Sequence, residues 1–285
     1  MSVLAPVRTG TNETRGAQTI AGAFGQARGN NRIALVPYIV AGYPDAETSF
    51  EIALTAADAG ADLLEIGLPY SDPLADGATL QRASSAAIRN GQTFEASLRL
   101  VERIAAARPD VPLVPMGYAN QIIGGGDGTA TAKRLADAGA RGLIVADLTP
   151  DEGAPFEAVA RAAELAVVYL VAPTTTPERR AMIAARTGGF LYCVSLIGVT
   201  GARTMLPSAV GRLVRQVKAV SPVPVGVGFG ISRPEHIRAL AKAGADGAIV
   251  ASAFVDALGD DGRDVAALKR LVAALYRATG GQADR

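Results

Sequence analysis

Residues 46–66, AETSFEIALTAADAGADLLEI, contain a helix pattern, a turn and a strand pattern in direct succession. From Ala46 to Ala59 the apolar residues recur at the spacing of one helix face. Gly60 follows, and glycine suits the left-handed residue just after a helix. Asp62–Ile66 is then a short apolar run, as expected of a parallel strand that is covered on both faces. The stretch therefore predicts one repeat of an α/β fold.

The same two patterns alternate along the chain, and Ala-Gly-Ala turns join helix to strand at Gly60, Gly139 and Gly244. Eight short apolar runs are predicted as strands: Ala34–Val40, Asp62–Ile66, Pro112–Met116, Gly142–Ala146, Ala166–Val171, Phe190–Val194, Pro224–Val227 and Gly247–Val250. The longer amphipathic runs are predicted as helices: Ala46–Ala59, Thr93–Ala107, Thr129–Ala138, Asp151–Glu164, Pro177–Arg186, Pro207–Val220, Arg233–Ala243 and Val265–Ala278.

Eight strand–helix pairs favour an α/β architecture made of a single (β/α)8 TIM barrel. The alternative is an open doubly wound sheet, but no Gly-x-Gly-x-x-Gly turn follows the first strand. Residues 1–16 are polar and rich in Gly and Thr, so they are expected to form a flexible N-terminal arm. An extra N-terminal helix is expected over residues 17–28. Because no linker or composition break follows, residues 17–285 are assigned to one barrel domain.

Composition narrows the possible partners. Of the 285 residues 49% are apolar, and the net charge of +1 gives no reason to expect nucleic acid or an anionic membrane as a partner. With one cysteine, Cys193, and one histidine, His236, no metal site built from these residues is predicted. Neither a signal peptide nor a membrane span is evident, so a cytoplasmic location is expected. Cys193 is expected inside a strand, and His236 at the surface or an interface.

Two carboxylates stand out near the second predicted strand. Glu65 interrupts the apolar run, and a carboxylate there is costly to bury unless it is paired, neutral or used in chemistry. Burial would raise its pKa and prepare it for proton transfer near neutral pH. Asp76 follows in a loop rich in proline and glycine, so the two could form an acid–base pair. The structural alternative is that Glu65 pairs with a basic residue of a neighbouring strand and that Asp76 caps a helix beginning at residues 77–79.

The run LEIGLPYSDPLADG at residues 64–77 resembles the signature of the tryptophan synthase alpha chain family, and the resemblance extends from about Arg32 to about Leu258. Further matching segments are Pro37-Tyr38, Ala41-Gly42, Tyr118-Ala119-Asn120, Gly198–Ala202 and Gly228–Ser232. The resemblance implies a carbon–carbon lyase of tryptophan biosynthesis, which performs the retro-aldol cleavage of indole-3-glycerol phosphate to indole and glyceraldehyde 3-phosphate. It also implies a β subunit as partner in an α2β2 tetramer. No metal or organic cofactor is expected in this chain, since pyridoxal phosphate belongs to the β partner.

The resemblance also assigns roles to individual residues. Glu65 matches the general acid–base, and Asp76 matches the carboxylate that accepts a hydrogen bond from the indole N–H. Tyr192 matches a tyrosine near the catalytic glutamate, whereas Tyr38 and Tyr118 match the lining of the indole pocket; ordinary packing is the alternative for all three. The phosphate is expected on Gly201, Phe229, Gly230, Ala251 and Ser252. Thr200, in a closing loop at Leu196–Leu206, is expected to contact Asp76.

The sequence departs from the family pattern at three places. Leu196 and Ile197 replace a more polar start of the closing loop, and Ala251 stands where glycine is common. The segment Gln121–Gly128 is rich in glycine and lacks a proline after Asn120, in a region that meets the β subunit in the family. Three alternatives stay open beside the family's reaction. They are a stand-alone indole-3-glycerol phosphate lyase that releases free indole, a barrel with only a regulatory or scaffolding role, and another phosphate-binding barrel such as a sugar-phosphate isomerase.

Overall fold

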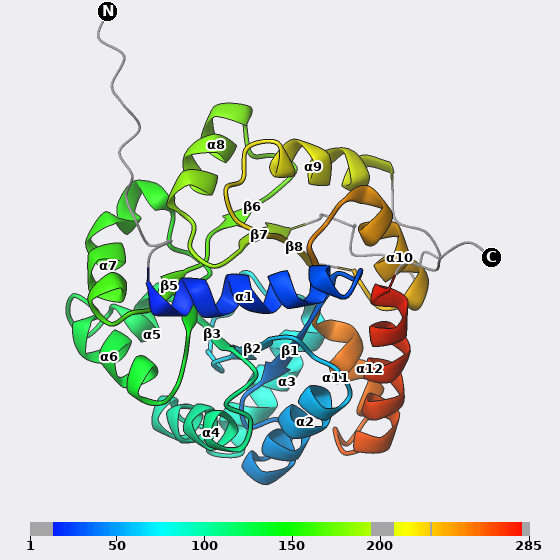
Figure 1. The fold of residues 1–285 in the computed structure, drawn as a ribbon. Helices are drawn as coiled ribbons and strands as arrows, with labels where there is room; N and C mark the ends of the chain where they lie inside the picture. Colours follow the sequence, from blue (N-terminus) through cyan, green and yellow to red (C-terminus); the bar gives the residue numbers. More distant parts are fainter. Residues whose placement is uncertain (1–13, 195–207, 229, 281–285) are drawn as a thin grey trace, which may run out of the picture.

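The computed structural model describes residues 14–194, 208–228 and 230–280 (Figure 1). The strands are β1 (Ala34–Val40), β2 (Leu64–Gly67), β3 (Leu113–Gly117), β4 (Gly142–Val145), β5 (Ala166–Val167), β6 (Leu170–Val171), β7 (Leu191–Val194), β8 (Val225–Gly228) and β9 (Gly247–Val250). The helices are α1 (Arg15–Gly29), α2 (Ala46–Asp58), α3 (Ala78–Arg89), α4 (Phe94–Ala107), α5 (Ala119–Ile122), α6 (Thr129–Asp137), α7 (Pro150–Ala162), α8 (Pro177–Arg186), α9 (Ser208–Lys218), α10 (Pro234–Ala243), α11 (Ser252–Ala257) and α12 (Val265–Thr279).

The strands form one parallel sheet in the order β5-β4-β3-β2-β1-β9-β8-β7-β6. Its two outer members, β5 and β6, are parts of a single run, and the residues between them connect the two edges. The backbone N–H of Val168 donates to the carbonyl of Leu143 (3.0 Å), and that of Tyr192 donates to the carbonyl of Tyr169 (3.0 Å). The run therefore bonds to β4 on one side and to β7 on the other, which confirms the predicted (β/α)8 barrel.

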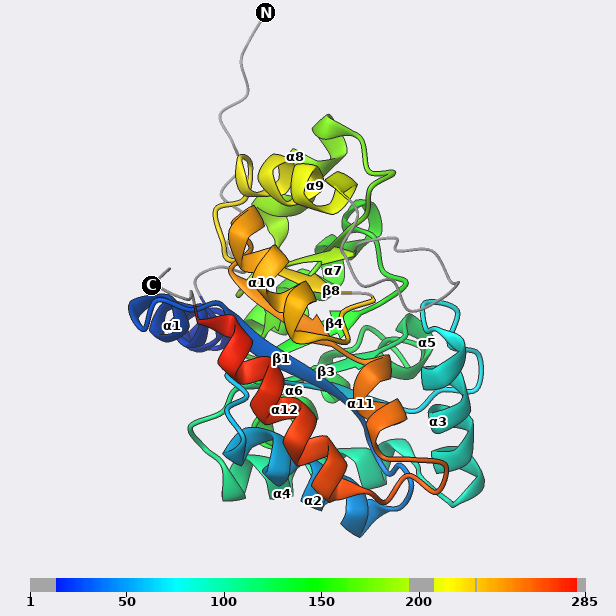
Figure 2. The same ribbon diagram turned by 90° about the vertical axis from the view of Figure 1, so that its right-hand side faces the viewer.

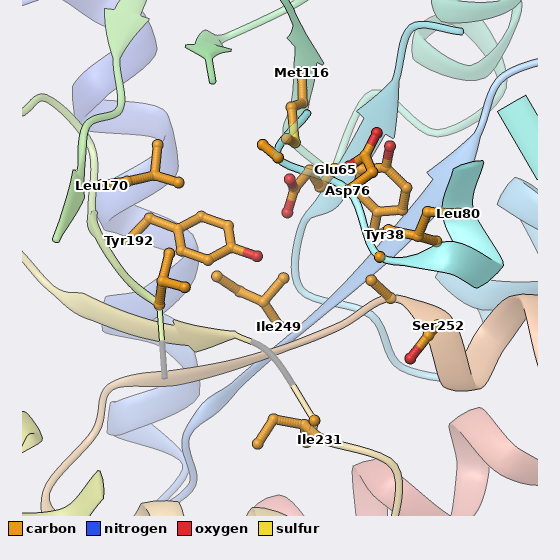
Figure 3. Close-up of a pocket in the computed structure, with 15 residues that line it drawn as sticks. Tyr38, Glu65, Asp76, Leu80, Met116, Leu170, Tyr192, Ile231, Ile249 and Ser252 are labelled. Carbon is orange, nitrogen blue, oxygen red and sulfur yellow. The ribbon is translucent and has the colours of Figure 1, made fainter. Parts of the chain in front are cut away.

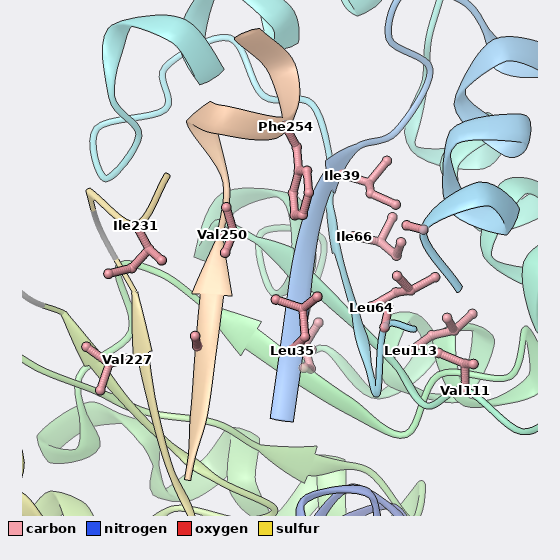
Figure 4. Close-up of a cluster of buried hydrophobic side chains, with 14 of the residues drawn as sticks. Leu35, Ile39, Leu64, Ile66, Val111, Leu113, Val227, Ile231, Val250 and Phe254 are labelled. Carbon is pink, nitrogen blue, oxygen red and sulfur yellow. The ribbon is translucent and has the colours of Figure 1, made fainter. Parts of the chain in front are cut away.

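The apolar core has two parts, inside the barrel and around it. Inward-facing residues such as Val36, Leu63 and Ile144 are fully buried and form one cluster. The larger cluster lies between the strands and the surrounding helices and includes Leu35 and Leu64 (Figure 4). Because successive strand residues point to opposite faces, both faces must be apolar, as the continuous apolar runs in the sequence predict.

Helix α1 confirms the predicted extra N-terminal helix and lies across one end of the barrel (Figures 1 and 2). It begins at Arg15, where the Thr14 hydroxyl accepts a hydrogen bond from the Ala17 N–H (3.1 Å). Its residues Ile20 and Phe24 join the inner cluster and close this end. Most of the expected arm, residues 1–13, lies outside the described residues.

Three helices were not among those expected, and all three follow a strand on the side where the site lies. They are α3 after β2, α5 after β3 and α11 after β9. The signal for α3 is present, since Leu80, Ala83, Ser84 and Ala87 are buried at helical spacing. The structural alternative for Asp76 also placed a helix start at residues 77–79, and α3 begins there, at Ala78. Within the described ranges, no helix is long and apolar enough to cross a membrane.

Candidate active site

A cavity of about 420 Å³ opens at the carboxyl ends of the strands (Figure 3), which is where the loops of a (β/α)8 barrel place chemistry. The residues that line it are Tyr38, Glu65, Ala75, Asp76, Gly77, Leu80, Met116, Leu170, Tyr192, Val194, Gly230, Ile231, Ile249, Ala251 and Ser252. Most of these side chains are apolar, and the two carboxylates are the only acidic groups among them. The cavity therefore suits a largely apolar ligand that carries a few polar groups.

Glu65 reaches the cavity from β2, where it pairs in register with Tyr38 of β1 and Val114 of β3. Its side chain is fully buried, and neither carboxylate oxygen has a hydrogen-bond partner. Burial, assisted by the nearby charge of Asp76, raises the pKa of Glu65 to about 8. Since desolvation disfavours the charged form, Glu65 carries a proton at neutral pH.

Asp76 enters the cavity from the loop between β2 and α3, and its environment differs from that of Glu65. Burial raises the pKa of Asp76 to about 6, and a hydrogen bond from the Tyr118 hydroxyl opposes the rise. At neutral pH Asp76 is therefore mostly ionised while Glu65 is mostly protonated. One cavity thus holds a proton donor and a carboxylate acceptor.

The structural alternatives for these two carboxylates are wrong. Among the described residues no basic side chain pairs with Glu65, whose oxygens are both unsatisfied. Helix α3 has Gly77 as its N-cap residue, without a side-chain cap, so Asp76 does not cap it. Neither carboxylate is explained by a structural role of this kind.

Tyr38 and Tyr192 are buried tyrosines that face the cavity from β1 and β7. Each hydroxyl fits against a glycine of the adjacent strand. A Cβ atom at Gly67 would lie 1.9 Å from the Tyr38 hydroxyl, and one at Gly228 would lie 2.4 Å from the Tyr192 hydroxyl. Burial and the two carboxylates raise both tyrosine pKa values well above their ordinary value, so the hydroxyls remain protonated and can donate hydrogen bonds.

Tyr118 is not among the residues that line the cavity, although the resemblance places it in the indole pocket. Its hydroxyl accepts a hydrogen bond from the Ala75 backbone N–H (3.0 Å), next to Asp76. Its ring stacks on Tyr70 with centroids 5.1 Å apart, and the Asn120 side chain donates to the Tyr70 hydroxyl (3.1 Å). The structure therefore places Tyr118 behind the loop that carries Asp76.

The structure describes only some of the residues that are expected to bind the phosphate. Gly230, Ala251 and Ser252 line the cavity after β8 and β9. Ala251 has a φ of −117°, so alanine meets no left-handed strain there, although glycine is common in the family. Three further predicted contacts, Thr200, Gly201 and Phe229, lie outside the described residues, as does the Leu196–Leu206 loop.

The sequence did not single out the apolar walls of the cavity. Leu80, Met116, Leu170, Ile231 and Ile249 line it together with the residues already named. The signal for Met116 and Ile249 was their place near the ends of predicted strands, at inward-facing positions. In the part of the chain that the structure describes, no group of three or more His, Cys, Asp and Glu side chains could hold a metal ion.

Comparison with known proteins agrees with this geometry. A family model described as Tryptophan synthase alpha chain matches residues 24–280. The chain belongs to the tryptophan synthase alpha chain family. The tryptophan synthase alpha chain of Gloeobacter violaceus is 48% identical over 241 residues, which are 84% of this chain and 86% of that protein. That of Methanothermobacter thermautotrophicus is 44% identical over 251 residues, which are 87% and 92% of the two chains. A solved structure of Mycobacterium tuberculosis tryptophan synthase matches with a TM-score of 0.84 at 40% identity, covering 91% of this chain and 97% of that one.

Membership in the tryptophan synthase alpha chain family confirms the resemblance drawn from residues 64–77 and makes the chain an enzyme of tryptophan biosynthesis. Both of these relatives are alpha chains of the synthase, which does not favour a stand-alone lyase or a sugar-phosphate isomerase. The roles of the individual site residues remain predictions.

Proposed function

We propose that this alpha chain is a carbon–carbon lyase that cleaves indole-3-glycerol phosphate to indole and glyceraldehyde 3-phosphate. The observation that carries the proposal is the pair of carboxyl groups in one apolar cavity, Glu65 protonated and Asp76 ionised at neutral pH. A retro-aldol cleavage of this substrate needs a proton donor at indole C3 and a negative group near the indole N–H. The pair supplies both.

The proton movements can be followed through these two residues. Glu65 gives its proton to C3 of the indole ring, and Asp76 accepts a hydrogen bond from the N–H as positive charge develops on the ring. The Glu65 carboxylate then takes the proton of the side-chain hydroxyl on the carbon attached to C3. That oxygen forms the aldehyde of glyceraldehyde 3-phosphate, the carbon–carbon bond breaks, and its electron pair restores the indole ring. Glu65 ends protonated, so the cycle closes without a redox partner.

The remaining walls of the cavity fit the two ends of this substrate. Leu80, Leu170 and Ile249 offer apolar surface to the indole ring, and Tyr38 and Tyr192 can donate hydrogen bonds near the carboxylates. At the other end, Gly230, Ala251 and Ser252 line the cavity, and backbone N–H groups of the turns after these strands commonly bind phosphate in barrels of this type. Thr200, Gly201 and Phe229 complete the proposed substrate contacts.

The chemistry proposed here requires no metal or organic cofactor in this chain, and pyridoxal phosphate is expected only in the β partner. The partner is proposed to be a tryptophan synthase β subunit, in an α2β2 tetramer in the cytoplasm, with residues 17–285 as the catalytic barrel. The support is that solved structures similar to this chain are those of tryptophan synthase.

The test is indole release from indole-3-glycerol phosphate, measured with and without a tryptophan synthase β subunit. Glu65→Gln should abolish it, because an amide can neither donate nor recover the proton. Glu157→Gln is the matched control, since Glu157 is a buried glutamate that does not line the cavity. An unchanged rate in Glu65→Gln would overturn the assignment of the acid–base. Rapid release by the isolated chain, not increased by the β subunit, would instead support a stand-alone lyase.

A further inference from the structure

The turn at residues 230–233 leads from the cavity wall into α10, a helix that lacks the usual side-chain hydrogen bond at its N-cap. Gly230, with a φ of +71°, and Ile231 line the cavity, and the chain then passes through Ser232 into α10. The N-cap position of α10 is Arg233, whose side chain makes no cap hydrogen bond. Helices usually begin with a short polar side chain that accepts from a backbone N–H of the first turn. In this turn the stabilising hydrogen bond comes instead from a side chain inside the helix.

The side chain that makes this hydrogen bond is His236. It is the third residue of α10 and is buried, with 4% of its surface exposed, so the expectation that it lies at the surface or an interface was wrong. Its ring Nδ1 accepts a hydrogen bond from the backbone N–H of Ser232 (3.2 Å), and the backbone N–H of His236 donates to the carbonyl of Arg233 (3.0 Å). The third helical residue thus reaches back to the residue before the N-cap, much as the glutamate of a capping box reaches back to the N-cap itself.

We propose that His236 is a positioning residue that holds Gly230 and Ile231 in the conformation that binds the phosphate end of the substrate. Only Ile231 separates Gly230 from the tethered residue, so a displacement of Ser232 would move the cavity wall directly. A planar ring buried in the core can hold an acceptor in one place with little freedom. The inference rests on the proposed function, because it takes the phosphate to bind at this end.

The position of His236 in the barrel separates its effect from that of the acid–base pair. It lies after β8, whereas Glu65 lies on β2, and β1 and β9 stand between these strands in the sheet. Loss of the tether should therefore weaken binding of phosphate without changing proton transfer at Glu65. A purely structural role would instead lower stability and affect all ligands alike.

The experiment compares His236→Leu, which removes the acceptor, with His236→Asn, whose Oδ1 takes the place of Nδ1. For each variant and the wild type, KM and kcat for indole-3-glycerol phosphate are measured with the β subunit present. Competition by inorganic phosphate and binding of indole, which lacks phosphate, are measured alongside. His236→Leu should raise KM and the inhibition constant of phosphate roughly three- to tenfold, the range expected for one hydrogen bond. The kcat value and indole binding should be retained, and His236→Asn should restore the two constants.

A second measurement needs no variant. His236 is the only histidine in the sequence, so the imidazole ¹⁵N signals of an untagged chain belong to it. They should show an Nδ1 without a proton, since this atom accepts a hydrogen bond, and they should shift when inorganic phosphate saturates the site. This measurement tests the role of His236 even if His236→Leu does not fold.

The results that overturn the role of His236 differ from those that overturn the reaction. Unchanged phosphate constants in a folded, active His236→Leu variant would overturn the role, as would a parallel loss of indole binding or unchanged ¹⁵N signals in the presence of phosphate. A wild-type chain that makes no indole with the β subunit present would overturn the proposed reaction itself.

Discussion

Replacing Glu65 with glutamine is expected to stabilise the folded chain at alkaline pH while it abolishes indole release. The carboxyl of Glu65 is fully buried and its pKa is raised from 4.5 to about 8. In the unfolded chain the same group ionises near its ordinary value. Between these two pH values the folded chain holds a proton that the unfolded chain has released, so the free energy of unfolding falls as the pH rises through this window.

The size of the effect follows from the two pKa values. The interval from 4.5 to about 8 corresponds to about 5 kcal/mol at a pH above both values, because one pKa unit is worth about 1.4 kcal/mol. From about pH 6 to about pH 8.5 the wild type should lose about 3 kcal/mol of this stability. Glu65→Gln cannot ionise and should lose none of it.

The assay is urea unfolding of both proteins at several pH values, with the midpoint and the slope recorded separately. The control is Glu157→Gln, which should lower the free energy of unfolding where Glu65→Gln raises it. Glu157 is buried too, but its carboxylate accepts hydrogen bonds from the Tyr169 hydroxyl (2.7 Å) and from the Arg186 guanidinium (2.9 Å). Glutamine replaces the charged acceptor of the Tyr169 hydroxyl and of the partly exposed Arg186 guanidinium by a neutral one, so the control should lose about 1 to 3 kcal/mol.

Two results would contradict the reasoning. If Glu65→Gln and the wild type lose stability equally between about pH 6 and about pH 8.5, Glu65 is not the group that titrates. If both glutamine variants are destabilised to the same degree, Glu65 has a compensating partner, and its proton is not held by burial.

Three further predictions concern activity. The pH profile of kcat/KM should be bell-shaped, falling below about 6 as Asp76 gains a proton and above about 8 as Glu65 loses one. Tyr118→Phe should move the acidic limb to higher pH, because the hydrogen bond from the Tyr118 hydroxyl lowers the pKa of Asp76; an unmoved limb would contradict this. Gly228→Ala should lower kcat by about tenfold or more, because the added methyl would lie 2.4 Å from the Tyr192 hydroxyl and displace that ring; wild-type kcat would show that the ring can move without cost.

Two matched variants control for these substitutions. Tyr70→Phe removes the hydroxyl that accepts from Asn120 but keeps the stacked ring pair, so it should leave the acidic limb where it is in the wild type. Gly211→Ala on α9 adds a methyl at ordinary contact distance, 3.6 Å from its nearest neighbour, and should leave kcat unchanged.

The sequence predicts regular elements best where one pattern repeats without interruption. The predicted strand Ala34–Val40 coincides with β1, and helix α8 has its predicted bounds, Pro177–Arg186. The run Ala166–Val171 is one strand in the sequence but two in the structure, because Val168 bonds to β4 and Tyr169 to β7. Which neighbour a strand residue bonds to depends on how the barrel closes, and hydrophobic periodicity does not carry that information.

Some residues of the site can be predicted from the sequence, and others cannot. Glu65 stands out because it breaks an apolar strand pattern, and local rules are often broken at functional sites. The place of Tyr118 could not be predicted, because its contact with Ala75 joins two loops that are far apart in the sequence. His236 is expected at the surface or an interface, because the sequence places it on a helix just after Pro234. Its burial beside Ile237 and Leu240 shows that it shares the inward face of α10.

The two buried glutamates show why pairing decides function in this barrel. Glu157 has partners on two other segments, and its charge contributes to holding α7 and α8 against the β5–β6 run. Glu65 has no such partner among the described residues, so burial favours the neutral form. A neutral carboxyl whose pKa is near 8 can give up a proton and recover it near physiological pH. The same missing partner that should cost the chain stability at alkaline pH therefore makes Glu65 suitable as the acid–base, and one substitution should change both properties together.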